Sequence, residues 1–140
     1  MKLDTSADLD ALTLPNSDNG VLLQLEELLR GLKDRPNWML RSLFQLLERH
    51  SEHDFGSPGG IVHFLEDYPR RNYEAELLAS LKRRPTTHTT WMLNRLINGT
   101  SGPAKLALLD TMNQLCKATQ LDVREDARRF VAFHAKPPTP

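Results

Sequence analysis

The chain has 140 residues, of which 39% are hydrophobic and 26% charged, a composition typical of one globular domain with its own core. Its 18 basic residues balance 18 acidic ones, and that balance disfavours a general nucleic-acid binder, which is usually basic overall. The single cysteine, Cys116, excludes an intramolecular disulfide. It lies on an apolar helical stripe and is predicted to be a small buried hydrophobe.

The two ends of the chain differ from its middle. The N-terminus carries acids where a signal peptide needs a basic flank and an apolar run, and no apolar stretch approaches the roughly 20 residues that span a bilayer. We therefore expect a cytoplasmic protein without a membrane segment. Residues 1–17 are polar and aperiodic, and residues 136–140 are rich in proline. The prediction is a flexible N-terminal segment and a flexible tail around a single helical domain, residues 18–135.

Apolar residues recur at helical spacing in the first half of that domain, and nowhere at sustained strand spacing. Four helices are predicted there, at about 19–33, about 36–51, from Ser57-Pro58 to Pro69, and about 72–84. Ser57-Pro58 is interpreted as an N-cap followed by proline at the first helical position. The apolar stripes, in order, are Leu22, Leu25, Leu29 and Leu32; Met39, Leu40, Leu43, Phe44 and Leu47; Ile61, Phe64, Leu65 and Tyr68; Tyr73, Leu77, Leu78 and Leu81.

Three more helices are predicted after Pro85, which makes about seven in an all-α fold. The fifth stops at Asn98-Gly99, a good C-terminal signal. The sixth opens at Ser101 with Pro103. The seventh starts at Asp122, which with Glu125 forms an acidic variant of the capping box. The expected apolar positions are Trp91, Met92, Leu96 and Ile97; Leu106, Leu109, Met112 and Leu115; Val123, Ala127, Phe130 and Val131.

An internal repeat indicates how these helices are arranged. Residues 27–36 (ELLRGLKDRP) and 76–85 (ELLASLKRRP) match at seven of ten positions, and a Trp-Met-Leu triplet follows each, at residues 38–40 and 91–93. The second copy holds four extra residues, about one helical turn, so the helix register survives. Each copy is a helix, a proline-marked turn and a second helix, the unit of stacked antiparallel HEAT-like hairpins. An irregular bundle with a chance resemblance is the alternative.

Charge is unevenly distributed along the chain. Residues 1–70 carry a net charge of −5, from 12 acidic and 7 basic residues, and residues 71–140 a net charge of +5, from 6 acidic and 11 basic residues. Acids at the C-terminal end of a helix oppose its dipole, and a feature that costs stability invites a functional explanation. Two such ends, if they pack side by side, predict one partner-binding acidic patch. Its residues are Glu48, Glu52, His53, Asp54, Glu66 and Asp67.

Other candidate sites are weaker. His50 and His53 have a spacing that zinc ligands use, but no Cys-x-x-Cys or His-Glu-x-x-His pattern accompanies them, so no metal site and no cofactor are predicted. His63 with Glu66 would suit general-base catalysis, yet spacing places no nucleophile beside them. We therefore predict no catalytic site and no small-molecule substrate. The exposed amides of the Gly59-Gly60 pair could hold an anion at a helix start, but tight packing or a flexible entry is the better interpretation.

Two stretches carry a family resemblance. Residues 57–66 (SPGGIVHFLE) and 85–98 (PTTHTTWMLNRLIN), with the helix Tyr73 to Lys82 between them, resemble small bacterial immunity proteins. Such proteins are encoded beside polymorphic toxins, including contact-dependent growth-inhibition systems. The resemblance covers roughly residues 57–98 and implies a cytoplasmic protein that binds and blocks the C-terminal toxin domain of its own system, often a nuclease. An acidic half suits the basic substrate cleft of a nuclease.

Three hypotheses follow. The first is an immunity protein that neutralises its cognate toxin by protein–protein interaction. The second is a HEAT-like scaffold or nucleic-acid-binding adaptor, although the charge balance makes nucleic acid the less favoured partner; its basic residues would be Arg70, Arg71, Lys82, Arg83 and Arg84. The third, an enzyme built on His63, has the least support.

Overall fold

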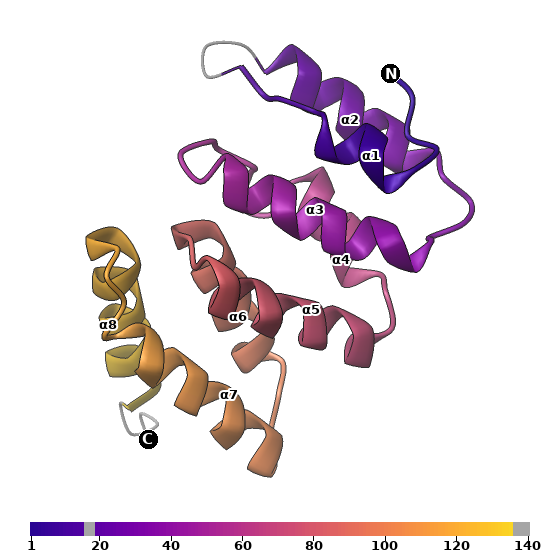
Figure 1. The fold of residues 1–140 in the computed structure, drawn as a ribbon. Helices are drawn as coiled ribbons and strands as arrows, with labels where there is room; N and C mark the ends of the chain where they lie inside the picture. The colour runs from indigo at the N-terminus through magenta and orange to yellow at the C-terminus, as the bar shows by residue number, and fades with distance from the viewer. Residues whose placement is uncertain (16–18, 136–140) are drawn as a thin grey trace. The chain divides into compact units, whose positions relative to one another are not determined.

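The computed structural model describes residues 1–15 and 19–135, and in these ranges the chain forms eight α-helices and no strand (Figure 1). The all-α prediction is confirmed. The seven predicted helices correspond to α2–α8, and α1 is an addition. The helices are α1 (Ser6–Asp10), α2 (Gly20–Arg30), α3 (Asn37–Arg49), α4 (Gly60–Glu66), α5 (Arg70–Arg83), α6 (Thr87–Asn98), α7 (Gly102–Leu115) and α8 (Leu121–Ala135).

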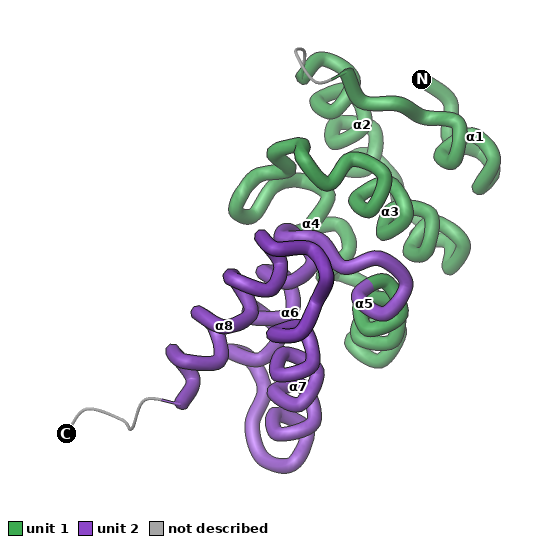
Figure 2. The backbone as a smooth tube through the Cα atoms, turned by 60° about the vertical axis from the view of Figure 1, so that its left-hand side comes forward, with its two compact units in different colours: residues 1–80 green, residues 81–140 purple. Residues whose placement is uncertain are grey.

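The chain divides into two compact units, residues 1–80 and 81–140, and the division falls inside α5 (Figure 2). The sequence predicts a single helical domain over residues 18–135 instead. The predicted flexible tail, residues 136–140, lies outside the described residues. None of the described helices combines the length and the apolar character that crossing a membrane requires.

The N-terminal residues of unit 1 are held against α3. The Arg49 guanidinium donates hydrogen bonds to the carbonyl oxygens of Leu9 and Leu12, both at 3.2 Å, and the Leu14 amide donates to Nε2 of His50 at 3.3 Å. Leu9 is completely buried, in the helix α1 that packs on α3. Residues 1–15, predicted to form a flexible segment, therefore pack against α3 in the structure. Their buried leucines (Leu3, Leu9 and Leu14) do not follow one periodic stripe, so the pattern gave no signal.

The core of unit 1 is formed as the stripes of α3 and α4 predict. All nine stripe residues of these two helices are buried: Met39, Leu40, Leu43, Phe44, Leu47, Ile61, Phe64, Leu65 and Tyr68. The Phe44 ring also lies 6.0 Å from the ring of Tyr73, which joins α3 to α5 within the unit.

The start of α4 differs from the prediction. The helix begins at Gly60 with Gly59 as N-cap, two residues later than Ser57-Pro58 predicts. A Cβ atom at Gly59 would lie only 1.9 Å from the Phe55 carbonyl oxygen, which shows that the chain turns tightly on Phe55 before it becomes helical. Phe55 itself is 2% exposed and anchors this turn in the core.

The two copies of the repeat agree in their second helices. Trp38 and Trp91 are both half-buried, and the following Met and Leu of each triplet are buried. The four extra residues of the second copy form the N-cap, Thr86, and the first turn of α6. Thr86 and Thr89 exchange backbone-to-side-chain hydrogen bonds of 3.0 and 3.1 Å there. Register is thus preserved by one added helical turn, as predicted.

The first helices of the two copies bury different faces. In the first copy Leu29 is buried and its neighbour Leu28 only partly, whereas the second copy buries Leu77, the equivalent of Leu28, and leaves Leu78 half-buried. The two copies therefore share the order of helices and turns, but the side of the first helix that faces the core differs between them.

Unit 2 is built on α6, α7 and α8, each of which contacts the other two. The residues that α7 buries are Leu108, Met112 and Leu115, whereas Leu106, predicted to be in the core, is 68% exposed. Leu106 precedes Leu108 by two residues, about 200° around the helix, so both cannot face the same neighbours. Cys116, predicted to be buried, is half-buried, and its thiol donates to the Met112 carbonyl at 3.6 Å.

The N-terminus of α8 also differs in detail from the prediction. The helix begins at Leu121, so Asp122 lies in its first turn and not at the N-cap of the predicted capping box. The Asp122 carboxylate accepts the amide of Val123 at 2.8 Å. Along α8 the expected stripe is buried at Val123 and Ala127, and half-buried at Phe130 and Val131.

Candidate binding surface

The acidic residues predicted as one patch lie at opposite ends of α3. The Tyr68 hydroxyl donates to the Pro36 carbonyl at 2.9 Å, so the end of α4 lies at the start of α3. Glu52 and Asp54 follow the other end of α3, a helix of 13 residues that spans about 20 Å. The prediction of a single patch is therefore wrong. In an antiparallel hairpin the C-terminal ends of successive helices point in opposite directions.

Glu48 does not reach the surface. Its side chain lies in the core of unit 1, the residue is 5% exposed, and Oε2 accepts a hydrogen bond of 2.7 Å from the Ser80 hydroxyl. Glu48 follows Phe44 by four residues, which puts both on the buried side of α3. Its role in the structure is to join α3 to α5, so a patch on the surface has to be formed without it.

The loop after α3, residues 51–56, presents the exposed acids. Glu52 and Asp54 are exposed, and Oδ1 of Asp54 accepts the Gly56 amide at 2.8 Å, which fixes a tight turn. The half-buried His53 ring lies 5.5 Å from the buried ring of Phe55. The loop is therefore anchored by Phe55 and carries the Glu52 carboxylate on its outer side.

The histidine that precedes this loop has a structural role. His50 is 8% exposed, and it accepts the Leu14 amide through Nε2, which requires that nitrogen to be unprotonated. Burial is the main cause that lowers the pKa of His50, and the neighbouring Arg49 guanidinium lowers it further. The interaction holds the N-terminal residues next to the acidic loop.

A cleft of about 380 Å³ lies between α2 and α4, and we call it the α2–α4 cleft. It extends along α4 from Gly60 to Asp67, the last of the predicted acidic residues, and its α2 side carries Glu26 and Arg30. Glu66 is half-buried at the end of α4 beside it. Of the two predicted acids at the end of α4, Asp67 therefore lines the cleft, and Glu66 precedes it in the sequence without lining the cleft.

Arg35 closes one end of the cleft. Its guanidinium donates to the Phe64 carbonyl at 2.9 Å, pairs with the Asp67 carboxylate at 3.2 Å, and lies 4.6 Å from the centroid of the Phe64 ring. The Phe64 carbonyl is one of the last four of α4, which have no partner within the helix. A cation there satisfies that carbonyl and complements the helix dipole.

Glu26 closes the other end. Its Oε2 accepts the Gly60 amide at 3.2 Å, so a carboxylate of the chain itself occupies the start of α4. A Cβ atom at Gly60 would lie 2.7 Å from the same oxygen, which explains glycine at this position. The preferred interpretation of Gly59-Gly60, tight packing, agrees with these close contacts, and the Gly60 amide binds a carboxylate of the chain itself, Glu26.

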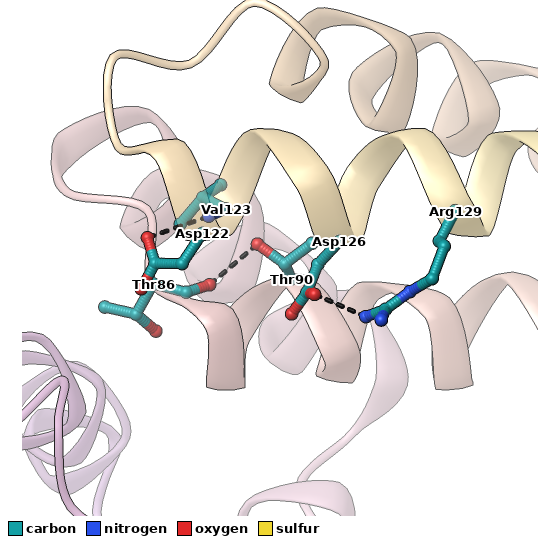
Figure 3. Close-up of polar contacts among 6 residues, drawn as sticks. All are labelled: Thr86, Thr90, Asp122, Val123, Asp126 and Arg129. Carbon is teal, nitrogen blue, oxygen red and sulfur yellow. Dashed lines mark hydrogen bonds and ion pairs between the residues drawn. The ribbon is translucent and has the colours of Figure 1, made fainter.

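In unit 2 several polar side chains of α6 and α8 form contacts within their own helix or with its N-cap. Figure 3 shows Thr90 donating to the Thr86 carbonyl, at 2.7 Å, and Asp126 paired with Arg129. A longer-range link joins His134 of α8 to Oδ1 of Asn94 in α6 at 2.7 Å. Burial, followed by the charge of Lys105, lowers the pKa of His134. Of these contacts, the one between His134 and Asn94 joins two helices of unit 2, α8 and α6.

The two units differ in net charge more than residues 1–70 and 71–140 do. Unit 1 contains 14 acidic and 8 basic residues, a net charge of −6, and unit 2 contains 4 acidic and 10 basic residues, a net charge of +6. Opposite fields of this size influence which partner approaches each unit, and how fast. Unit 1 is therefore the acidic part of the chain and unit 2 the basic part.

Within the described residues, no three His, Cys, Asp or Glu side chains are grouped as a metal ion requires. Comparison with family models, with curated proteins and with solved structures finds no match for the chain.

Proposed function

We propose that the chain is a cytoplasmic immunity protein that binds and neutralises a cognate toxin domain through a surface of unit 1. The function class comes from the resemblance of residues 57–98 to small immunity proteins of polymorphic toxin systems. The observation that carries the choice of surface is the net charge of −6 on unit 1, which favours the basic substrate cleft of a nuclease toxin as a partner.

The surface that we assign to this role includes the acidic loop, residues 51–56. Glu52 is exposed, and the loop that carries it is anchored by buried Phe55. A carboxylate on an anchored loop loses little conformational freedom when a partner binds, which favours affinity. Asp54 contributes charge as well, although its side chain also holds the turn with Gly56.

Calorimetry with the polypeptide encoded by the neighbouring gene tests the function. We expect tight one-to-one binding and loss of the partner's toxic activity in the complex; the absence of binding would refute the proposal. The variant Glu52→Lys should slow association and reduce its dependence on salt. Glu27→Lys is the matched control, because Glu27 is also exposed in unit 1 and the change in net charge is the same. An equal effect of both variants would argue against the acidic loop as the contact.

A second candidate function is favoured by the net charge of +6 on unit 2. Lys82, Arg83 and Arg84 are exposed at the end of α5 and in the residue that follows it. A scaffold or adaptor that binds nucleic acid through them should show affinity that falls steeply with added salt. A gel-shift titration at low salt that detects no complex would remove this candidate.

A further inference from the structure

The charged groups of the α2–α4 cleft are not equally engaged. Its two acids each have a partner inside the chain, because Glu26 accepts the Gly60 amide and Asp67 pairs with Arg35. Arg30 and His63 line the same cleft and are exposed. In the described part of the chain, neither side chain forms a hydrogen bond or an ion pair. The cleft therefore offers a guanidinium and an imidazole to a molecule from outside.

We infer that the α2–α4 cleft receives an acidic side chain, aspartate or glutamate, from the partner protein, and that Arg30 and His63 bind its carboxylate. This inference rests on the proposed function, since it assigns a contact within the same complex. A guanidinium matches a carboxylate through two parallel hydrogen bonds, and an imidazole N–H provides a further donor. The volume of about 380 Å³ is at the low end of ligand pockets and suits one inserted side chain.

The position of the cleft gives this contact a role in specificity. Unit 1 has a net charge of −6 and attracts basic surfaces in general. Any cationic protein would respond to that field. A partner that also places a carboxylate opposite Arg30 gains a paired contact, whereas one that places a lysine there meets a repelling guanidinium. The cleft thus distinguishes the cognate partner among basic competitors, because discrimination requires a repulsive element as well as an attractive one.

The structure also explains why the cleft keeps its form without a partner. Arg35 bridges the α2–α3 connection to the end of α4, and Glu26 joins α2 to the start of α4. The two walls are therefore linked at both ends. A site that is formed in advance costs little free energy to organise when a side chain enters.

The experiment compares two arginines of unit 1 that differ in position and not in charge. Arg30 lines the cleft, and Arg41 is exposed on α3 outside it. Arg30→Glu and Arg41→Glu each change the net charge of unit 1 from −6 to −8, so their effect on long-range attraction is the same. In calorimetry with the polypeptide encoded by the neighbouring gene, we expect Arg30→Glu to weaken binding about tenfold or more. Arg41→Glu should keep wild-type affinity or exceed it.

Two further variants separate the contact from other effects. Arg30→Gln removes the charge without placing an acid at the end of α2, and it should weaken binding more than Arg41→Gln does. His63→Ala should weaken binding again, with the thermal unfolding of each free variant checked by circular dichroism. Equal affinities of Arg30→Glu and Arg41→Glu would overturn the assignment of the cleft and leave the immunity function standing. No binding by the wild-type chain would refute the function, and the inference with it.

Discussion

Replacement of Arg35 by alanine should destabilise the protein by about 2 kcal/mol, and the contacts of this residue allow that figure to be worked out. The hydrogen bond to the Phe64 carbonyl is charge-assisted and contributes about 1.5 kcal/mol, the lower end of the usual range, because 34% of the Arg35 side chain is exposed. Asp67 is 66% exposed, so the ion pair adds less than about 1 kcal/mol. The contact with the Phe64 ring adds about 0.5 kcal/mol.

The repeat supplies the control for this prediction. Arg84 occupies the position equivalent to Arg35 in the second copy, and it is exposed. Arg84→Ala should therefore change the free energy of unfolding by less than about 0.5 kcal/mol. Urea unfolding followed by circular dichroism measures both variants, and Arg35→Lys should recover only part of the loss, because an ammonium cannot reproduce the planar guanidinium contacts. If Arg35→Ala and Arg84→Ala unfolded at the same urea concentration, the bridge from Arg35 to α4 would contribute nothing and the reasoning would fail.

Three other predictions concern the same unit. Gly59→Ala should cost more than about 2 kcal/mol of unfolding free energy, because its Cβ meets backbone 1.9 Å away. Gly31→Ala, whose Cβ has only ordinary contacts, should stabilise by about 0.4–1 kcal/mol in the same urea assay. Ser80→Ala should cost about 1–3 kcal/mol by removing the donor to buried Glu48, and Glu48→Gln should reduce stability without changing partner affinity. Stability should fall as the pH drops below about 6.5, because the pKa of His50 is lowered in the folded state and the unfolded chain takes up the proton first.

Each of these three predictions has a control that tests its physical cause. A Gly59→Ala variant as stable as Gly31→Ala would contradict the tight turn on Phe55. For the buried pair, a double-mutant cycle of Ser80→Ala with Glu48→Gln should show coupling, and strict additivity would mean that the two side chains do not interact. For the pH effect, His50→Gln removes the titrating group, so its stability should vary less than that of the wild type between pH 7.5 and pH 5.5. An identical pH profile would exclude His50 as the cause.

The sequence predicts elements with one strong apolar stripe correctly and those without a stripe poorly. The predicted core residues of α3 and α4 follow directly from helical spacing, although both helices also bury residues outside the stripe, such as Leu46 and Val62. The short helix α1 has only one fully buried residue, Leu9, and a helix of five residues has no period to detect. The exposed Leu106 is the opposite error, since spacing alone offers two stripes along α7 and cannot tell which one faces α6 and α8.

The candidate site shows a second limit, which concerns topology. Helix polarity correctly identifies Glu66 and Asp67 as acids at a helix end, yet only the antiparallel direction of α4 relative to α3 separates them from Glu52. That direction could have been inferred from the predicted helix bounds, which leave only about residues 52–56 as a connection, because hairpins reverse the chain. The partners of the acids could not, since Arg35 and Asp67 are 32 residues apart in sequence.

Taken together, these contacts change the physical basis of the proposed interface. A uniform acidic patch would attract any basic protein, and its affinity would decline steadily with salt. In the structure Glu48 is buried and Asp67 is paired, while an exposed arginine and histidine line the cleft between α2 and α4. In the proposed interface, the net negative field of unit 1 would bring a basic partner close, and the Arg30 and His63 side chains would decide whether that partner fits. The salt dependence of the association rate and the dissociation rate should therefore change independently of each other. If Arg30→Glu and other variants changed both quantities in proportion, that result would argue against two separate elements.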